Sequence, residues 1–325
     1  MKCLHFLRRI SLSAALICGS GSLVAQAQNL RAATAASYVE RGDEWYHKGE
    51  FARAEADFTL AIATDPNQAR AYCNRAVARG RRGRLTEALA DLDRALQLDP
   101  RLADAYLNRS QMRIELGDLA GALDDSNQAI ALKPKSALAW GSRGVARGRQ
   151  GEHALALGDF NQALKLDARN AVTWNNRGVA RRRLGDGKGA VSDHTQALKL
   201  APQYAEAWCD WGVTHYLNGA FAEALADYEQ SIALNPRSWE SWYNRALLRE
   251  AQADWARAEA DFTQAIALQP QDADAYAHRG IVRLRLSRKA EAQEDFDHCL
   301  ALNPLLRSSL ERMIAEAKRQ TKGKP

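Results

Sequence analysis

Carboxylate and guanidinium side chains recur along this chain at one fixed interval. Sliding the sequence against itself by 34 residues aligns an aspartate in every copy: Asp57, Asp91, Asp125, Asp159, Asp193, Asp227, Asp261 and Asp295. Two arginine columns recur at the same interval: Arg41, Arg75, Arg109, Arg143, Arg177, Arg245 and Arg279, then Arg79, Arg113, Arg147, Arg181, Arg249 and Arg283. Because a planar guanidinium binds a carboxylate through two parallel hydrogen bonds, these columns favour structural ion pairing over catalysis.

The aspartate and arginine columns together predict a ladder of buried ion pairs, in which each aspartate accepts hydrogen bonds from an arginine of its own unit or of the next. One unit separates these alternatives, since Trp211 and His215 replace both of its arginines while Asp227 stays. Pairing within the unit leaves Asp227 single, whereas pairing with the next unit leaves Asp193 single. Charges placed among apolar residues are costly unless paired, so the ladder is expected to fix the register of the units.

Side chains suited to catalysis do not gather in the sequence. The six histidines of the repeating region fall at six different positions of the 34-residue unit: His47, His153, His194, His215, His278 and His298. His194 and His215 are expected to meet at a junction between units, as packing substitutes rather than ligands. With no Cys, Asp or Glu at metal-ligand spacing beside them and no glycine-rich phosphate loop, we expect no enzyme, no metal and no cofactor.

Each 34-residue unit reads as two amphipathic helices that must position these charges. Its apolar residues follow helical spacing in both halves. Counting positions from residue 35, a glycine stands at position 15 in six units, alanine fills position 20 throughout, and proline fills position 32 except at Ala168. Acidic N-cap candidates such as Glu50, Asp118 and Asp254 follow the turn. Since a single helix pair leaves its apolar face exposed to water, neighbouring pairs must stack.

The chain resembles the tetratricopeptide repeat (TPR) family. The family pattern is met in one unit by Tyr72, Ala76, Ala88, Ala95 and Pro100. Position 4 is aromatic in every copy: Tyr38, Tyr72, Tyr106, Trp140, Trp174, Trp208, Trp242 and Tyr276. The resemblance implies an all-α, right-handed superhelical solenoid of antiparallel helix pairs, with eight repeats over residues 35–68, 69–102, 103–136, 137–170, 171–204, 205–238, 239–272 and 273–306.

The resemblance also implies a concave groove lined by the first helix of each repeat. Its candidate peptide-binding residues are Asn74, Asn108, Asn176, Asn244, Arg149, Arg182, Tyr216 and Tyr243. Side-chain amides both donate and accept, so a spaced row of them suits the backbone of an extended peptide. Tyr216, Leu217 and Tyr243 are expected to form an exposed aromatic patch. The groove positions are mostly basic in the earlier repeats and acidic in the later ones, which implies a peptide ligand of mixed charge.

One departure from the family pattern narrows the class of partner that the groove can bind. The clamp that some TPR proteins use for chaperone tails needs lysines and asparagines in three consecutive repeats, and here Asn74 and Asn108 match alone. The expected partners are proteins or peptides of another kind.

The N-terminus has the features of a bacterial signal peptide, which we expect to span residues 1–27. Lys2, Arg8 and Arg9 precede an apolar stretch, and Ala25-Gln26-Ala27 is a small-x-small cleavage motif, so cleavage is expected after Ala27 and the mature chain in the periplasm or outside the cell. The apolar run is too short to span a bilayer, which argues against a membrane anchor. A twin-arginine signal, a lipoprotein signal at Cys18 and an organellar transit peptide are the weaker alternatives.

The two ends carry the positive charge. Residues 1–27 hold three basic and no acidic residues, and residues 307–325 hold six basic and two acidic ones, against a formal net charge of +6 for the whole chain. The repeats are therefore near neutral, which argues against nucleic-acid binding. Residues 28–34 are expected to be a spacer, 307–317 a helix capping the last repeat, and 318–325 a disordered basic tail whose alternative role is weak contact with anionic lipid or polysaccharide.

The cysteines indicate no disulfide framework. Outside the expected signal peptide only Cys73, Cys209 and Cys299 remain, an odd number. The first two occupy the same position four repeats apart, so stacking keeps them distant.

Two functions are consistent with these features. The first is an exported, non-catalytic scaffold that binds extended peptide segments in the groove and holds an envelope complex together. The alternative is an exported sensor or carrier that binds an envelope polymer or small ligand at the aromatic patch of repeats 6 and 7.

Overall fold

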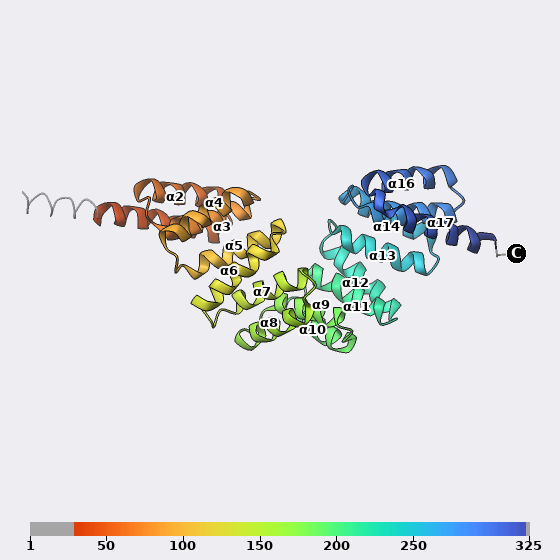
Figure 1. The fold of residues 1–325 in the computed structure, drawn as a ribbon, viewed down its shortest axis with the longest axis horizontal. Helices are drawn as coiled ribbons and strands as arrows, with labels where there is room; N and C mark the ends of the chain where they lie inside the picture. Colours follow the sequence, from red (N-terminus) through yellow and green to blue (C-terminus); the bar gives the residue numbers. More distant parts are fainter. Residues whose placement is uncertain (1–28, 323–325) are drawn as a thin grey trace, which may run out of the picture. The chain divides into compact units, whose positions relative to one another are not determined.

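The computed structural model describes residues 29–322, which consist of α-helices and short turns with one 3-10 helix and no β-strand. The chain divides into two compact units, residues 1–152 and residues 153–325. The expected signal peptide and its cleavage site after Ala27 lie outside the described residues. Figure 1 shows consecutive helices lying side by side as hairpins within each unit.

The first unit holds a helix over residues 29–47, followed by α2 (Phe51–Thr64), α3 (Ala69–Arg81), α4 (Leu85–Leu98), α5 (Ala103–Leu116), α6 (Leu119–Leu132) and α7 (Ala137–Arg149). The second unit holds α8 (His153–Leu166), α9 (Ala171–Arg183), α10 (Gly187–Leu200), α11 (Ala205–Leu217), α12 (Phe221–Leu234), α13 (Trp239–Ala251), α14 (Trp255–Leu268), α15 (Ala273–Arg285), α16 (Lys289–Leu302), η1 (Pro304–Leu306) and α17 (Arg307–Lys322). The predicted all-α array of antiparallel helix pairs is confirmed.

The turn within each helix pair uses a left-handed residue at position 15. Gly49, Gly83, Gly117, Gly151, Gly185 and Gly219 have φ between 75° and 85°, where a side chain is disfavoured. Ala253 and Ser287 take the same backbone conformation in the last two repeats, with φ of 60° and 66°. Asp118, Asp186 and Asp254 then cap the following helix, whereas Glu50 makes no capping hydrogen bond, contrary to expectation.

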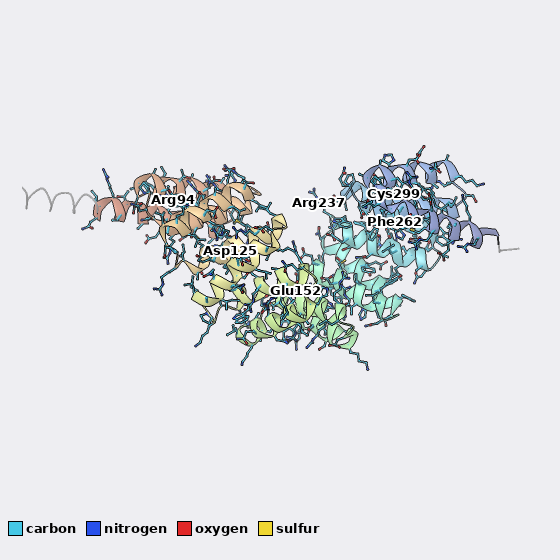
Figure 2. All side chains as sticks on the ribbon, in the orientation of Figure 1. Arg94, Asp125, Glu152, Arg237, Phe262 and Cys299 are labelled. Carbon is cyan, nitrogen blue, oxygen red and sulfur yellow. The ribbon has the colours of Figure 1, made fainter. Side chains whose placement is uncertain are left out.

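The two helices of a pair meet through positions 8 and 24, where side-chain sizes are complementary. A Cβ atom added to Gly42 would lie 2.6 Å from the ring of Phe58, and one added to Gly212 would lie 2.6 Å from the ring of Tyr228. Ala246 faces Phe262, which is labelled in Figure 2 and is fully buried. The small residue at position 8 therefore lets an aromatic ring from the second helix lie against the first.

Both ends of the described chain are more helical than expected. The spacer predicted over residues 28–34 is helical from residue 29 onward, and α17 continues to Lys322 instead of ending at Ala317. Leu, Ala, Arg, Lys and Gln are all good helix formers, and no Gly or Pro interrupts either segment, so nothing stops the helices earlier. Leu310 and Ala317 of α17 are buried in one cluster with Ile281 of α15.

Candidate functional site

In repeats 1, 2, 3, 5, 7 and 8 the arginines of the ladder bind the aspartate of their own repeat. Arg75 donates from Nε and Nη2 to the two carboxylate oxygens of Asp91 at 2.8 and 2.7 Å, and Arg79 donates from Nη1 at 2.8 Å. The same arrangement joins Arg109 and Arg113 to Asp125, Arg177 and Arg181 to Asp193, Arg245 and Arg249 to Asp261, and Arg279 and Arg283 to Asp295. In the first repeat Arg41 holds Asp57. The ladder is confirmed, with pairing inside the repeat.

Repeat 6 differs from the expectation that Asp227 is left single. His215 places Nδ1 2.7 Å from Asp227 Oδ2, so the imidazole takes the place of the second arginine. Trp211 stands where the first arginine would be, and its ring lies 4.9 Å from that of His215. Burial raises the pKa of Asp227 to about 6, against the opposing effect of the His215 hydrogen bond.

In repeats 2, 3, 4, 5, 7 and 8 the first arginine also reaches the preceding repeat. Its remaining terminal nitrogen contacts position 25 of that repeat, as in Arg109 with Asp93 at 2.6 Å and Arg177 with Asn161 at 2.9 Å. The same guanidinium lies over the aromatic ring at position 4, for example 4.5 Å from the ring centre of Trp174. One side chain thus stabilises a helix pair and its contact with the previous pair.

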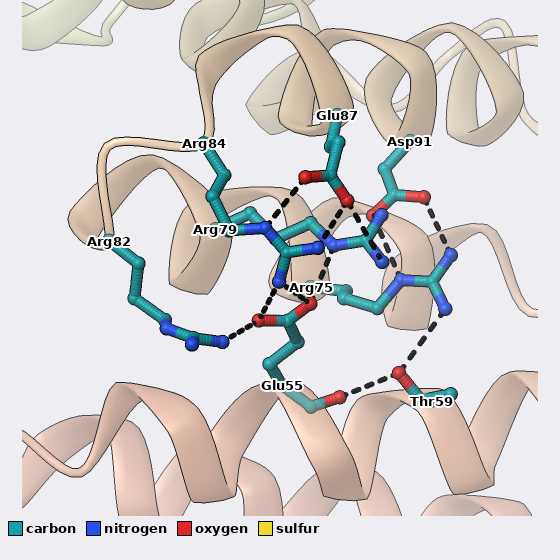
Figure 3. A network of polar contacts seen from close by, with 8 residues as sticks. All are labelled: Glu55, Thr59, Arg75, Arg79, Arg82, Arg84, Glu87 and Asp91. Atoms are coloured by element: carbon teal, nitrogen blue, oxygen red, sulfur yellow. Dashed lines mark hydrogen bonds and ion pairs between the residues drawn. The ribbon is translucent and has the colours of Figure 1, made fainter.

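A second polar network links repeats 1 and 2, as Figure 3 shows. Glu55 is almost fully buried and accepts hydrogen bonds from Arg79, Arg82 and Arg84. Although burial raises the pKa of Glu55, hydrogen bonds from Arg79 and Arg82 bring it below the ordinary value. Repeats 7 and 8 contain the same device, in which Glu259 binds Arg283 and Arg288. These charges are mutually satisfied, so the networks are structural.

Hollows lie on the face that the family resemblance assigned to the groove, which we call the inner face: positions 6, 9, 12 and 13 of the first helix in each repeat. In the first unit a hollow of about 470 Å³ is lined by Tyr46, Val77, Arg81, Asn108 and Met112, among others. In the second unit one of about 590 Å³ is lined by Tyr216, Leu247, Glu250, Trp255, His278 and Ile281, with Met313 of α17 at its wall.

The four predicted asparagines are half-buried, and three of them already have partners. Asn74 donates to Asp43 at 2.8 Å. Asn108 and Asn244 donate weakly to the sulfur atoms of Cys73 and Cys209, each at 3.5 Å. Asn176 makes no side-chain hydrogen bond to any residue that the structure describes. Only Asn108 lines one of the two inner-face hollows.

The two predicted arginines have unlike surroundings. Arg149 is exposed and donates to the carbonyl oxygen of Ile114 at 2.7 Å. The side chain of Arg182 is only 11 % exposed, and its Nη2 lies 4.0 Å from Asp210 Oδ1.

The predicted aromatic patch is only partly exposed, which corrects the expectation. Leu217 is 62 % exposed, and Tyr216 is half-buried at the hollow of the second unit. Tyr243 is half-buried between Trp239, Phe262 and His278, with ring centres 5.8 to 6.2 Å away. Rings from its own helix α13 and from α14 and α15 cover it. Burial also raises the pKa of Tyr243.

A buried polar cluster in repeats 5 and 6 was not foreseen. Asn175, the neighbour of the predicted Asn176, donates from Nδ2 to Asp210 Oδ2 at 2.8 Å and faces His194 Nδ1 through Oδ1 at 2.9 Å. Asn175 and His194 are 2 % and 0 % exposed. His194, which was expected to meet His215, bonds Asn175, and the charge of His215 is among the causes that lower the pKa of His194. An asparagine at position 5 where other repeats have apolar or small residues was the sequence signal.

Within residues 29–322, no helix combines the length and apolarity needed to cross a bilayer. The same part of the chain brings together no group of three or more His, Cys, Asp or Glu side chains able to hold a metal ion. Cys73, Cys209 and Cys299 are buried free thiols.

Tetratricopeptide repeat models match residues 69–102, then 107–171, 142–205 and 175–238, and then 214–279. The chain belongs to the tetratricopeptide repeat family. These matches cover most of this TPR protein, and the match over residues 69–102 coincides with the second repeat. No curated protein matches the chain.

Several solved structures share the TPR fold. A chain of the APC/C hetero-tetramer Cut9–Hcn1 has a TM-score of 0.68 at 17 % identity, over 81 % of this chain and 52 % of that one, so the match spans about half of that protein's length. A tetratricopeptide repeat protein from Parabacteroides merdae has a TM-score of 0.61 at 19 % identity, over 82 % and 99 %. PilF of Pseudomonas aeruginosa has a TM-score of 0.53 at 22 % identity, over 66 % and 97 %. At these identities the likeness concerns the fold alone.

Proposed function

We propose that this TPR protein is a non-catalytic scaffold that binds extended segments of partner proteins on its inner face. The observation that carries the proposal is that each unit has a hollow on this face, lined by the same repeat positions. Both hollows combine apolar side chains with amide or charged groups, the combination that lets a site hold a peptide and fix its orientation. The ion-pair ladder lies apart from these hollows and holds the helices that form them.

We propose further that the protein is exported and serves an envelope complex. The support is the basic, then apolar, then small-residue order of residues 1–27. The near-neutral repeats and the charged ends fit protein partners and give no support to nucleic acid. Fractionation of the producing cell and N-terminal sequencing test this part: a mature chain beginning at Gln28 in the periplasm or medium supports it, and an intact N-terminus in the cytoplasm contradicts it.

A sensor or carrier function is the second candidate, because the hollow of the second unit places Tyr216, Trp255 and Leu247 around about 590 Å³. This volume falls in the range of small-molecule sites. The hollow is open and includes Glu250 and His278, which bond each other at 2.8 Å. A small ligand would need to use the apolar wall and leave this pair intact.

One experiment separates the two candidates. Partners are captured from the envelope fraction with the wild type, with Asn108→Ala in the hollow of the first unit and with Tyr216→Ala in that of the second. A peptide scaffold predicts that defined proteins are retained by the wild type and lost in at least one variant. Retention of polysaccharide or a small molecule, lost only in Tyr216→Ala, would favour the carrier.

A further inference from the structure

The guanidinium of Arg182 is largely buried without a hydrogen-bond acceptor. Its side chain is 11 % exposed, its Nε is fully buried without a partner, and the nearest carboxylate oxygen, Oδ1 of Asp210, lies 4.0 Å from Nη2. No other side chain or carbonyl among the described residues accepts from it. Burying a charge without hydrogen bonds is unfavourable, so an acceptor from outside the chain would stabilise this guanidinium.

A chain of hydrogen bonds through Asn175 and His194 fixes the orientation of the Asp210 carboxylate. Asn175 donates from Nδ2 to Oδ2 of Asp210 at 2.8 Å, and its own Oδ1 lies 2.9 Å from Nδ1 of His194. Because Asn175 offers His194 a carbonyl oxygen, Nδ1 of the imidazole must carry the proton and donate. Burial lowers the pKa of His194 to about 3, so the ring is neutral and this direction of donation is kept at physiological pH.

This chain of bonds orients the carboxylate so that one oxygen is occupied and the other is available. Oδ2 of Asp210 is engaged by Asn175, while Oδ1 faces Arg182 across 4.0 Å. The side chain of Asp210 keeps 31 % exposure. Burial raises the pKa of its carboxyl group, whereas the hydrogen bond from Asn175 and the charge of Arg182 lower it. A guanidinium donor and a carboxylate acceptor therefore stand side by side, too far apart to satisfy each other.

The pair occupies the inner face. Arg182 stands at position 12 of repeat 5 and Asp210 at position 6 of repeat 6, and Glu250 and His278 stand at the same two positions in repeats 7 and 8. Glu250 and His278 line the hollow of the second unit and bond each other directly at 2.8 Å. The side chains at these two positions thus bond each other in repeats 7 and 8 but not in repeats 5 and 6.

We infer that Arg182 and Asp210 clamp the main chain of one residue of an extended peptide. The peptide carbonyl oxygen accepts from Nη2 of Arg182, and the N–H of the same residue donates to Oδ1 of Asp210. A residue in an antiparallel strand exchanges both of these bonds with its partner, so an extended chain presents the two groups to one side. This inference rests on the proposed peptide-binding function and adds how the ligand is held independently of its sequence.

An anionic ligand group fits the pair less well than an amide. The carboxylate of Asp210 stands beside the guanidinium, and Glu206 lies one turn earlier on α11. A carboxylate bound to Arg182 would be repelled by both. A neutral peptide unit meets the donor and the acceptor together.

The test uses peptides selected from a random library on the purified full chain, measured by fluorescence anisotropy. Each peptide is resynthesised with one backbone N–H at a time replaced by an ester oxygen. We expect one ester position to weaken binding to the wild type by about tenfold to a hundredfold, the value of a hydrogen bond to a charged group. That penalty should vanish in Asp210→Ala, and Arg182→Ala should weaken all selected peptides regardless of sequence. Arg183→Ala, which removes a neighbouring exposed charge, is the matched control.

The outcomes separate this inference from the proposed function. If peptides are selected but Arg182→Ala binds them as tightly as the wild type, or every ester penalty persists in Asp210→Ala, the clamp is wrong while peptide binding stands. If binding depends on the free C-terminal carboxylate and is lost on amidation and in Arg182→Ala, the site reads a carboxylate and the clamp is wrong. If the wild type selects no peptide at all, the proposed function fails and the clamp with it. Melting temperatures of the variants establish that they are folded.

Discussion

His215 lies with its Nδ1 2.7 Å from Oδ2 of Asp227, in the one described rung where a histidine serves instead of arginine. In repeats 1, 2, 3, 5, 7 and 8 the aspartate faces one or two guanidinium groups, which are charged at every physiological pH. The carboxylate of Asp227 is as deeply buried as the others but has a weaker partner. Repeat 6 is therefore the place where the ladder responds to pH.

The first prediction concerns the pH dependence of stability at Asp227. Burial raises its folded-state pKa to about 6, above its ordinary value, so the folded state binds this proton more tightly than the unfolded state does. Its contribution to the free energy of unfolding is therefore fully present below about pH 4 and is lost as the pH rises toward 6. Urea titrations at pH 4, 5, 6 and 7 should show the wild type losing stability relative to Asp227→Asn over this range.

The substitution His215→Arg restores the residue found at this position in most repeats. An arginine lowers the pKa of the neighbouring carboxyl, so its benefit should grow from pH 4 to pH 7. An advantage that stayed constant with pH would contradict the role given to His215.

The second prediction concerns an intact rung. Asp125 accepts from Arg109 and Arg113 and is 2 % exposed. Asp125→Ala leaves two guanidinium groups without their acceptor and should lower the free energy of unfolding by about 3–5 kcal/mol. The control is Asp104→Ala, which breaks an ion pair with Lys133 whose members are both more than half exposed, and should cost at most about 1 kcal/mol. Equal losses in the two variants would mean that the ladder contributes no more than a surface pair.

The third prediction concerns the turn residues. Ala253 has φ of 60°, a conformation that costs a residue with a side chain about 1–2 kcal/mol, whereas Gly117 at the same repeat position has φ of 82° without that cost. Ala253→Gly removes this cost, but glycine also has more conformational entropy in the unfolded chain, which offsets part of the gain. The free energy of unfolding should therefore rise by up to about 1 kcal/mol. Gly117→Ala should lower it by about 1 kcal/mol. Thermal unfolding followed by circular dichroism measures both, and changes of the same sign would refute the explanation.

The fourth prediction concerns the network of Figure 3. Glu55→Gln keeps the shape of the side chain but removes the charge that Arg79, Arg82 and Arg84 share. We expect a loss of about 1–3 kcal/mol at pH 7, the range for a hydrogen bond to a charged group. Glu87→Gln nearby removes a carboxylate that is 47 % exposed and should change stability by less than about 1 kcal/mol. A Glu55→Gln variant as stable as wild type in urea would show that the arginines find water equally well.

The repeat and its ion-pair ladder could be predicted from the sequence because both are periodic. A residue that recurs every 34 positions occupies the same place in every helix pair. The sequence alone therefore predicts that the aspartate column of Asp91 pairs with the arginine column of Arg75. The glycine turns followed from the same argument. What the columns left open was whether the bonds stay within a repeat, because that choice depends on side-chain reach rather than on period.

Features present in only one or two repeats escaped prediction. Glu55 and Arg84 stand 29 residues apart, as do Glu259 and Arg288, and this repeated spacing was the available signal. The bond between Asn175 and Asp210 joins two first helices of neighbouring repeats, so it follows from how the repeats stack. The covering of Tyr243 likewise depends on three rings from different helices, which no single helical face reveals.

Because the aspartates of the ladder are bonded to bases of their own repeat, to arginines in repeats 1, 2, 3, 5, 7 and 8 and to His215 in repeat 6, removing or duplicating one of these 34-residue segments takes the acid and its bases together. Such a change leaves no aspartate of the ladder without its base, although loss of repeat 2 or repeat 8 would remove the arginines that bind Glu55 or Glu259. The arginine that reaches the preceding repeat finds a polar or charged residue at position 25 of whichever neighbour it meets. Away from those two networks, an array built in this way can change its number of modules during evolution without a matching set of compensating substitutions, whereas a deletion of any other length would separate acid from base at once.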